Sequence, residues 1–272
     1  MPCACRVLAL LWGELLAADF EGEAFHMDEA YGDEIARRRG EILDRIASAA
    51  AEAGRDPKEV RLVAVSKTVG VPEVLAAIDA GYRSFGENRP QELARKLAGL
   101  AEVPDLPPVR FDMIGNLQKN KINAVIGRVP LIHSISSLHL AEAVSSRAEK
   151  RVADGELSAP QDVLLEVNVS GEGSKSGFSP DELRASLDEL RSLPGIRLRG
   201  LMTMAPRGDR AVARRTFAGL RELRGELAAR DPSLDLSELS CGMSEDFEEA
   251  VKEGSTIVRL GRVVFDPSFE LR

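Results

Sequence analysis

The stretch Val60-Arg61-Leu62-Val63-Ala64-Val65-Ser66-Lys67-Thr68 decides the fold of this chain. Its apolar run from Leu62 to Val65 is typical of a short strand that is buried on both faces, as in a parallel sheet. Lys67 stands where that strand should end. Because an unpaired lysine is costly to bury, Lys67 must be solvated, paired with an acid or used chemically. A desolvated lysine can form a Schiff base with a carbonyl compound, so the residues placed beside it decide between these roles.

Strand-like and helix-like segments alternate along the chain. The predicted strands are 60–67, 82–86, 110–115, 131–135, 162–168, 197–204, 236–240 and 256–260. Helical spacing of apolar residues predicts helices at 33–53, 72–81, 90–100, 118–126, 138–152, from 180 onward, at 210–229 and at 244–252. Eight strands alternating with helices predict one (β/α)8 barrel. The alternative is an open doubly wound sheet, but no Gly-x-Gly-x-x-Gly follows the first strand.

Composition limits the classes of function. The 272 residues carry a formal net charge of −8, which argues against a general surface for nucleic acid or anionic membranes. Cys3, Cys5 and Cys241 have no paired spacing, and the three histidines form no metal-ligand cluster. A reducing, cytoplasmic location is the simpler interpretation. Aromatic residues make up only 4%, so we expect an aliphatic core, which suits helices packed on a parallel sheet.

The N-terminus reads differently from the rest. The run from Val7 to Trp12 resembles the core of a signal peptide, but Glu14 interrupts it and it is too short to span a bilayer. Secretion is therefore not favoured. An acidic, well-patterned helix begins soon after Met27, which makes Met27 the more economical start. We expect residues 1–26 to be an extension and residues 27–272 to form the barrel.

Active groups of such barrels lie at the carboxyl ends of the strands. Lys67, Asn88, His133, Met202 and Ser240 stand at such ends. Loops after the seventh and eighth strands commonly build a phosphate site from backbone N–H groups. The run 240–244 leads into a helix that Ser244 is expected to cap, and Gly261 would let the backbone approach an anion closely. A lysine facing such a cradle suggests a covalently bound phosphorylated aldehyde.

Arg259 adds a clue about the ligand's electronics. A cation near the pyridine nitrogen of pyridoxal phosphate disfavours protonation of the ring, whereas an aspartate favours it. The residue is equally well explained by a salt bridge at a strand end. Two other candidates are better explained by structural roles than by catalysis. We interpret His133 as a hydrogen-bonded buried histidine rather than a base, and Glu87 as a supporting carboxylate rather than a catalyst.

The motifs resemble those of the pyridoxal phosphate homeostasis family, which is related in fold to the N-terminal domain of alanine racemase. The matching segments are 64–68, 85–92, 114–121, 132–134, 166–168, 174–178, 199–204, 242–247 and 258–261. They follow the family's order over roughly residues 34–266. The resemblance implies a protein that binds pyridoxal 5′-phosphate and buffers or delivers it, with apo forms of enzymes that use this cofactor as potential partners, and with a monomer or weak dimer as the expected assembly.

The resemblance also assigns site residues. It implies Lys67 as the Schiff-base lysine, Asn88 and Arg259 near the ring, and a group around the phosphate. That phosphate group is Ser240, Gly242, Gly261 and Arg262; Met202 completes the expected cofactor-binding set. This chain departs from the family at four places. Phe111-Asp112 replaces a usual Trp-His, Ser136 a frequent aspartate, Arg262 a frequent threonine and Asp266 a common glycine.

Two enzymatic alternatives remain. An amino-acid racemase using the same cofactor needs a second base on the other face of the substrate, which is a tyrosine in alanine racemase. Tyr31 precedes the barrel and Tyr82 begins the second strand, at the wrong end. The chain also ends soon after its eighth strand, which leaves no room for the additional domain of alanine racemase. The weaker alternative is an aldolase-like barrel that uses Lys67 on a sugar phosphate. A carrier without turnover is therefore favoured.

Overall fold

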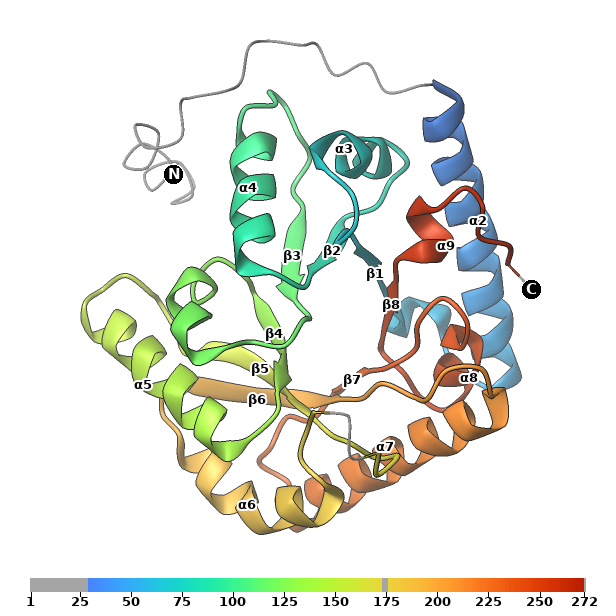
Figure 1. Cartoon of the computed structure of the whole chain (residues 1–272). Coiled ribbons are helices and arrows are strands. Elements are labelled where there is room, and N and C mark those ends of the chain that lie inside the picture. Colours follow the sequence, from blue (N-terminus) through green and yellow to red (C-terminus); the bar gives the residue numbers. More distant parts are fainter. Residues whose placement is uncertain (1–28, 173–175, 272) are drawn as a thin grey trace.

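A closed parallel barrel forms the centre of the protein. The computed structural model describes residues 29–172 and 176–271, and within them eight strands pair in chain order, with β8 pairing back onto β1. The strands are β1 (Arg61–Val65), β2 (Ser84–Glu87), β3 (Arg110–Met113), β4 (Leu131–Ile135), β5 (Gln161–Glu166), β6 (Ile196–Met202), β7 (Glu238–Ser240) and β8 (Ile257–Leu260). Figure 1 shows the helices arranged around the ring of strands. The predicted (β/α)8 barrel is confirmed.

Helices connect successive strands and cover the outside of the barrel. They are α2 (Glu29–Glu52), α3 (Val71–Asp79), α4 (Pro90–Ala101), α5 (Leu138–Ala153), α6 (Pro180–Ser192), α7 (Arg210–Arg230), α8 (Phe247–Lys252) and α9 (Arg262–Phe265), with 3₁₀ helices η1 (Pro57–Glu59) and η2 (Lys119–Ala124). The start of α6 follows the sequence signal closely: Ser179 Oγ accepts the N–H of Glu182, whose carboxylate accepts the N–H of Ser179. This reciprocal pair fixes the first turn.

Two local predictions are wrong. The segment predicted as a helix at 118–126 is the shorter 3₁₀ helix η2, in which Lys121 N–H donates to the Gln118 carbonyl three residues earlier. Ser244 does not cap α8, because a turn comes first: Asp246 Oδ1 accepts the Met243 N–H at 2.6 Å, and Asp246 takes the cap position. Short polar side chains compete for backbone groups in this way and delay the helix.

The core has two parts because strand side chains alternate between the two faces of the barrel wall. Outward-facing residues such as Ala64, Phe85 and Leu260 belong to the large cluster that includes the covering helices. The smaller cluster joins five strands inside the barrel: Val63, Leu131, Leu164, Met202 and Ile257. Polar side chains occupy part of the interior alongside this cluster, and they are the ones that bear on the site.

One arginine ties α2 to the segment that follows the last strand. Arg38 is only 5% exposed. Its Nη1 donates to the carbonyls of Val263 (3.1 Å) and Asp266 (2.8 Å), and its Nη2 to those of Pro267 (2.8 Å) and Phe269 (3.0 Å). Three of these four carbonyls lie beyond the end of α9, and a single side chain from the first described helix thus satisfies them.

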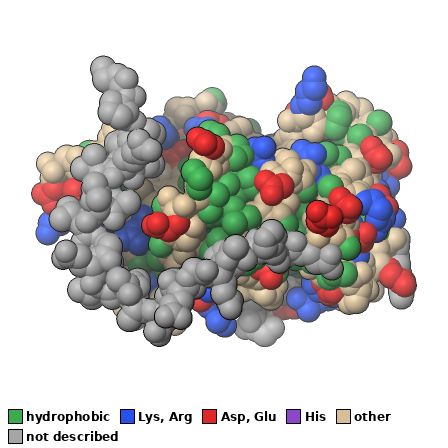
Figure 2. Space-filling model, turned by 90° about the horizontal axis from the view of Figure 1, so that it is seen from above, with side chains coloured by type: hydrophobic (Ala, Val, Ile, Leu, Met, Phe, Trp, Pro, Cys, Tyr) green, Lys and Arg blue, Asp and Glu red, His purple; other side chains and the backbone are tan. Residues whose placement is uncertain are grey.

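The surface mixes charge signs. On the face shown in Figure 2, acidic and basic side chains are interspersed around a group of hydrophobic ones. None of the helices in the described ranges is both long enough and apolar enough to cross a membrane.

Candidate functional site

The structure places the predicted site residues on one face of the barrel. Met202 and Ser240 are the last residues of β6 and β7, and Arg259 is the last but one of β8. The others lie in the loops just beyond strand ends: Lys67 after β1, Asn88 after β2, Gly242 after β7, and Gly261 with Arg262 after β8. Because β8 pairs with β1, the lysine and the arginine come from neighbouring strands although they are far apart in sequence.

Lys67 lies in a tight turn at the end of β1. The N–H of Val69 donates to the carbonyl of Ser66 at 3.1 Å, so Lys67 and Thr68 are the two central residues of that turn. Ser66 is fully buried, whereas Lys67 is exposed. The turn therefore presents the lysine amine to solvent at the carboxyl end of the barrel.

Arg259 is a buried cation held at two points. Its Nη1 donates to Ser240 Oγ at 2.6 Å and its Nη2 to the carbonyl of Thr203 at 3.1 Å. Burial lowers the pKa of its guanidinium, while Cys241, Asp246 and Glu166 oppose that shift. These contacts fix one edge of the guanidinium against β6 and β7.

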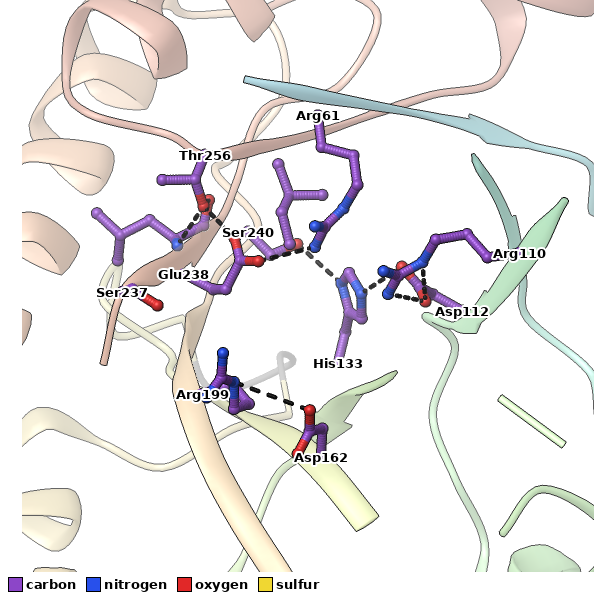
Figure 3. Close-up of polar contacts among 12 residues, drawn as sticks. Arg61, Arg110, Asp112, His133, Asp162, Arg199, Ser237, Glu238, Ser240 and Thr256 are labelled. Carbon is purple, nitrogen blue, oxygen red and sulfur yellow. Dashed lines mark hydrogen bonds and ion pairs between the residues drawn. The ribbon is translucent and has the colours of Figure 1, made fainter. Parts of the chain in front are cut away.

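A chain of hydrogen bonds continues from Ser240 across the barrel interior, as Figure 3 shows. Ser240 Oγ lies 2.9 Å from His133 Nδ1, and His133 Nε2 lies 3.3 Å from Asp112 Oδ2. Arg110 donates to the other Asp112 oxygen at 2.7 Å. The ionised Asp112 carboxylate can only accept, so His133 Nε2 donates to it; in the neutral ring, Nδ1 then accepts the Ser240 hydroxyl, whose oxygen accepts from Arg259. The network thus assigns the proton of His133 to Nε2, which donates to Asp112.

The protonation states of His133 and Asp112 agree with this direction of the hydrogen bonds. Burial lowers the pKa of His133, against the hydrogen bond and charge of Asp112, so the ring is neutral near pH 7. Burial alone would raise the pKa of Asp112, but the hydrogen bonds and charges of His133 and Arg110 hold it below its usual value. The hydroxyl proton of Ser240 is committed inside the barrel. Contacts to an anion in the next loop would then come mainly from backbone N–H groups.

Glu166, at the end of β5, is a buried acid that the sequence did not single out. Burial raises the pKa of its carboxyl group, while a hydrogen bond from Ser176 (3.0 Å) and the charge of Arg259 lower it. It is 3% exposed. Its position adds a titratable group to the same end of the barrel as Arg259.

The loop after β7 requires a glycine. Gly242 has φ +96°, and a Cβ there would lie 2.6 Å from the Cβ of Ala250 and 3.0 Å from the Cα of Phe247. Gly261 differs, since it caps α9 at φ −110° and a Cβ would meet only ordinary contacts at 3.4 Å. Packing against Ala250 and Phe247 therefore excludes a side chain at Gly242, whereas the close approach of an anion at Gly261 stays a prediction. Ser244 joins the two loops by accepting the N–H of Val263 at 3.3 Å.

Arg262 points away from the barrel interior. Its Nη2 donates to Glu245 at 2.6 Å, and its guanidinium carbon lies 5.0 Å from the ring centre of Phe269. It lines a pocket of about 700 Å³ formed by the loops before α7 and α8 and by residues 266–270. Of the predicted cofactor-binding residues, Arg262 lines this pocket, whereas Lys67 and Arg259 do not.

Behind Lys67 lies a pair of buried charges: Glu87, which the sequence analysis interpreted as a supporting carboxylate, and Lys96, which it did not single out. The Lys96 and Glu87 side chains are both fully buried and form an ion pair, and Ser66 Oγ donates to Glu87 Oε1 at 2.8 Å. The signal was present in the helix pattern, since Lys96 lies between Leu93 and Leu100 on the buried face of α4. A lysine on such a face needs a buried acid.

Comparison with known proteins identifies the family. Residues 40–268 match the family described as "Alanine racemase, N-terminal domain". A protein of Pseudomonas aeruginosa named "Pyridoxal phosphate homeostasis protein" is 42% identical over 85% of this chain and 94% of its own length. One of Aquifex aeolicus with the same name is 40% identical over 84% and 96%. The chain belongs to the pyridoxal phosphate homeostasis protein family. The resemblance inferred from the motifs is confirmed.

Solved structures agree with this family assignment. PipY of Synechococcus elongatus, solved with pyridoxal phosphate bound, is 37% identical and covers 82% of this chain and 99% of its own, with a TM-score of 0.69. Alanine racemase of Corynebacterium glutamicum covers 88% of this chain and 63% of its own, with a TM-score of 0.60. At 15% identity that second likeness shows the shared fold alone.

Proposed function

We propose that this protein binds pyridoxal 5′-phosphate reversibly, and that it buffers or delivers the cofactor without significant turnover of its own. The observation that carries the proposal is an exposed lysine and a buried arginine on neighbouring strands of a family barrel, together with the PipY relative that has pyridoxal phosphate bound. A strand-end amine, a fixed cation and a loop that excludes any Cβ at Gly242 fit a phosphorylated aldehyde.

Each group has a separate part in binding. Lys67 would hold the cofactor through its amine, which can condense with the aldehyde carbon with loss of the aldehyde oxygen as water. Arg259, held by Ser240 and Thr203, places a positive charge toward the ring and disfavours protonation of its nitrogen. The loop at Gly242 supplies backbone N–H groups to the phosphate. Asn88 would lie near the ring, and Met202 completes the proposed cofactor-binding set.

The described residues support a carrier rather than a racemase. Tyr31 donates its hydroxyl to the Phe265 carbonyl, and Tyr82 is buried ahead of β2. His133 uses both ring nitrogens in the barrel interior and is not exposed. Burial raises the pKa of Cys241 to about 11. None of these four groups is placed as an accessible second base, which racemisation requires.

Reduction with borohydride tests the binding mode. With pyridoxal phosphate bound, we expect the label on Lys67, because its amine is presented at the carboxyl end of the barrel. Lys67→Ala should lose the near-visible absorbance band of the imine and keep weaker non-covalent binding. Lys119→Ala changes an exposed lysine elsewhere in the family motifs and is the matched control. Labelling mainly at Lys119 or Lys121 would contradict the assignment.

The absence of turnover is tested by exchange of the Cα proton. With stoichiometric cofactor in deuterated water, we expect L- and D-alanine or serine to exchange at the rate given by free pyridoxal phosphate. Loss of one acid–base group typically lowers a rate by about 10²–10⁴-fold, so a missing second base leaves little to detect. Exchange well above that background, and lost in Lys67→Ala, would make this protein an enzyme.

We further propose a cytoplasmic protein, monomeric or weakly dimeric, that hands the cofactor to apo forms of pyridoxal phosphate-dependent enzymes. Residues 27–272 are proposed as the functional unit; the predicted extension, residues 1–26, and the motif residues 174–175 lie outside the described residues. The family match from residue 40 supports this boundary. A chain beginning at Met27 should bind the cofactor as tightly as the full chain, measured by titration of the imine absorbance.

A further inference from the structure

The turn that carries Lys67 rests on a buried polar network outside the barrel wall. Lys96 Nζ, from α4, donates to the Ser66 carbonyl at 2.5 Å and forms the ion pair with Glu87. The Ser66 carbonyl also accepts the Val69 N–H that closes the turn. One oxygen therefore anchors the turn from two directions, and it belongs to the peptide group that joins Ser66 to Lys67.

The same network reaches the end of β2. Glu87 accepts the Ser66 hydroxyl on Oε1 at 2.8 Å and the backbone N–H of Asn88 on Oε2 at 3.1 Å. Asn88 in turn packs against Gly115, where a Cβ would lie 2.4 Å from the Asn88 carbonyl oxygen. The backbone positions of two predicted site residues, Lys67 and Asn88, thus depend on one buried carboxylate and one buried amine.

Stability alone is a weak explanation for this pair. Removing two charges from water is costly, and well-packed neutral residues often stabilise a fold as well or better. Direct electrostatic help to Lys67 is also a weak explanation, because the positive Lys96 and the negative Glu87 cancel at a distance. What the pair supplies is geometry: two strand ends held by hydrogen bonds whose directions neutral, apolar residues would not fix.

We propose that Glu87 and Lys96 are positioning residues that hold the Lys67 turn so that its amine meets the aldehyde of the bound cofactor. This rests on the proposed function of Lys67. Neither residue touches the ligand; both act through the Ser66 carbonyl and the Asn88 N–H.

The test compares two ligands on one variant. Glu87→Gln/Lys96→Met removes both charges and the bond to the Ser66 carbonyl, and leaves no unpaired buried charge. Pyridoxal phosphate can form the imine, whereas 4′-deoxypyridoxine phosphate has the same ring and phosphate but no aldehyde. We expect affinity for pyridoxal phosphate, and the rate at which the imine band appears, to fall roughly tenfold to a hundredfold, as misplacement of a reacting group does. Affinity for the deoxy compound should stay within about twofold of the wild type, because the amide oxygen that Glu87→Gln leaves can still accept the Asn88 N–H, so Asn88 stays in place and the Lys67 amine moves.

Arg95→Met is the matched control, since Arg95 is the preceding residue of α4 and forms an exposed pair with Glu92. It should leave both affinities and the imine rate unchanged. Ser66→Ala removes the hydroxyl contact to Glu87 and the longer one to the Gly86 carbonyl at 3.4 Å, keeps both buried charges paired, and should show the same selective loss at smaller size. If the double variant does not fold, as judged by circular dichroism, the comparison of the two ligands on Ser66→Ala tests the positioning role instead.

The outcomes separate this inference from the function beneath it. If the double variant binds both ligands and forms the imine as the wild type does, or weakens for both ligands by the same factor, the positioning role is wrong. If wild-type protein itself shows no lysine that borohydride fixes, the proposed function has failed, whatever the variants do.

Discussion

The two ends of the barrel carry the same kinds of charged side chains in different surroundings. At the amino end, Arg197 pairs with Asp162 at 2.5 Å, with the two side chains 53% and 25% exposed. Behind the carboxyl end, Lys96 and Glu87 pair with both side chains fully buried. Water screens the first pair and competes for its hydrogen bonds, so its net value is small. The second pair has no water to replace a lost partner, so losing one member leaves the other unsatisfied.

The largest effect on stability should come from replacing only one residue of the buried ion pair. Lys96→Met leaves the Glu87 carboxylate buried without its cation, and we expect it to destabilise folding by about 3–5 kcal/mol in urea unfolding. Glu87→Gln/Lys96→Met should recover most of this loss, because no lone charge remains. A double variant as unstable as the single one would show that burial of charge is not the cause.

A smaller effect is expected from the backbone of the same end. Gly242→Ala places a Cβ 2.6 Å from that of Ala250 at a φ that side chains rarely adopt, and it should destabilise by about 1–3 kcal/mol. Gly261→Ala, at φ −110° with its nearest contact at 3.4 Å, should change the free energy of unfolding by less than about 1 kcal/mol. Equal losses in thermal unfolding of the two variants would contradict the different roles of these glycines.

The buried histidine predicts a dependence of stability on pH. Burial lowers the pKa of His133 in the folded protein. At pH values between this lowered pKa and the ordinary value of about 6.5, His133 is therefore protonated in the unfolded chain and neutral in the folded one. The contribution of neutral His133 to the free energy of unfolding is full above about pH 6.5. Below that pH it is lost by up to about 1.4 kcal/mol per pH unit. Asp112, Arg259 and Arg61 are the charged groups that act on it.

Urea unfolding between about pH 7 and pH 5 measures this slope. His133→Gln should flatten it, whatever its effect at neutral pH. The exposed His139, beside Glu142, provides the control: His139→Gln should keep the wild-type slope. A slope that His133→Gln leaves intact would assign the titration to another group.

The smallest effect belongs to the exposed end. Arg197→Met removes the ion pair with Asp162, although Arg199 still lies 3.8 Å from the Asp162 carboxylate. We expect this variant to lower the free energy of unfolding by only about 0.2–1 kcal/mol. Raising the salt concentration should shrink the difference further. A loss as large as that of Lys96→Met would erase the contrast between the two ends.

The features that sequence predicted share a local cause. Buried strands are short apolar runs, so the run from Leu62 to Val65 could be recognised, and the order of eight such runs implied the barrel. The motif residues, from Lys67 to Arg262, fall at strand ends because a parallel barrel gathers those ends on one face. The helix start predicted at residue 180 agrees with α6, because the capping box of Ser179 and Glu182 depends on neighbours alone.

The features that sequence missed depend on distant partners. Ser244 and Asp246 are both acceptable caps, and the turn at Met243 decides between them. Lys96 looked like one more charge on a helix until Glu87 and Ser66 were seen to face it. Asp112 was noted only as a departure from the family, yet it completes the chain of hydrogen bonds that runs from Arg110 to Arg259. Such pairings arise from register and helix docking, which no single segment encodes.

The contacts of Arg38 have a consequence for how the protein is made. They join residues 225 to 231 positions apart, and the β1–β8 seam beside them joins the strand before Lys67 to the strand that bears Arg259. On the ribosome, the early strands emerge long before β8 exists, and contacts of such long range form late. A nascent chain therefore holds Lys67 without its arginine neighbour. The proposed cofactor site is therefore complete only after the barrel has closed.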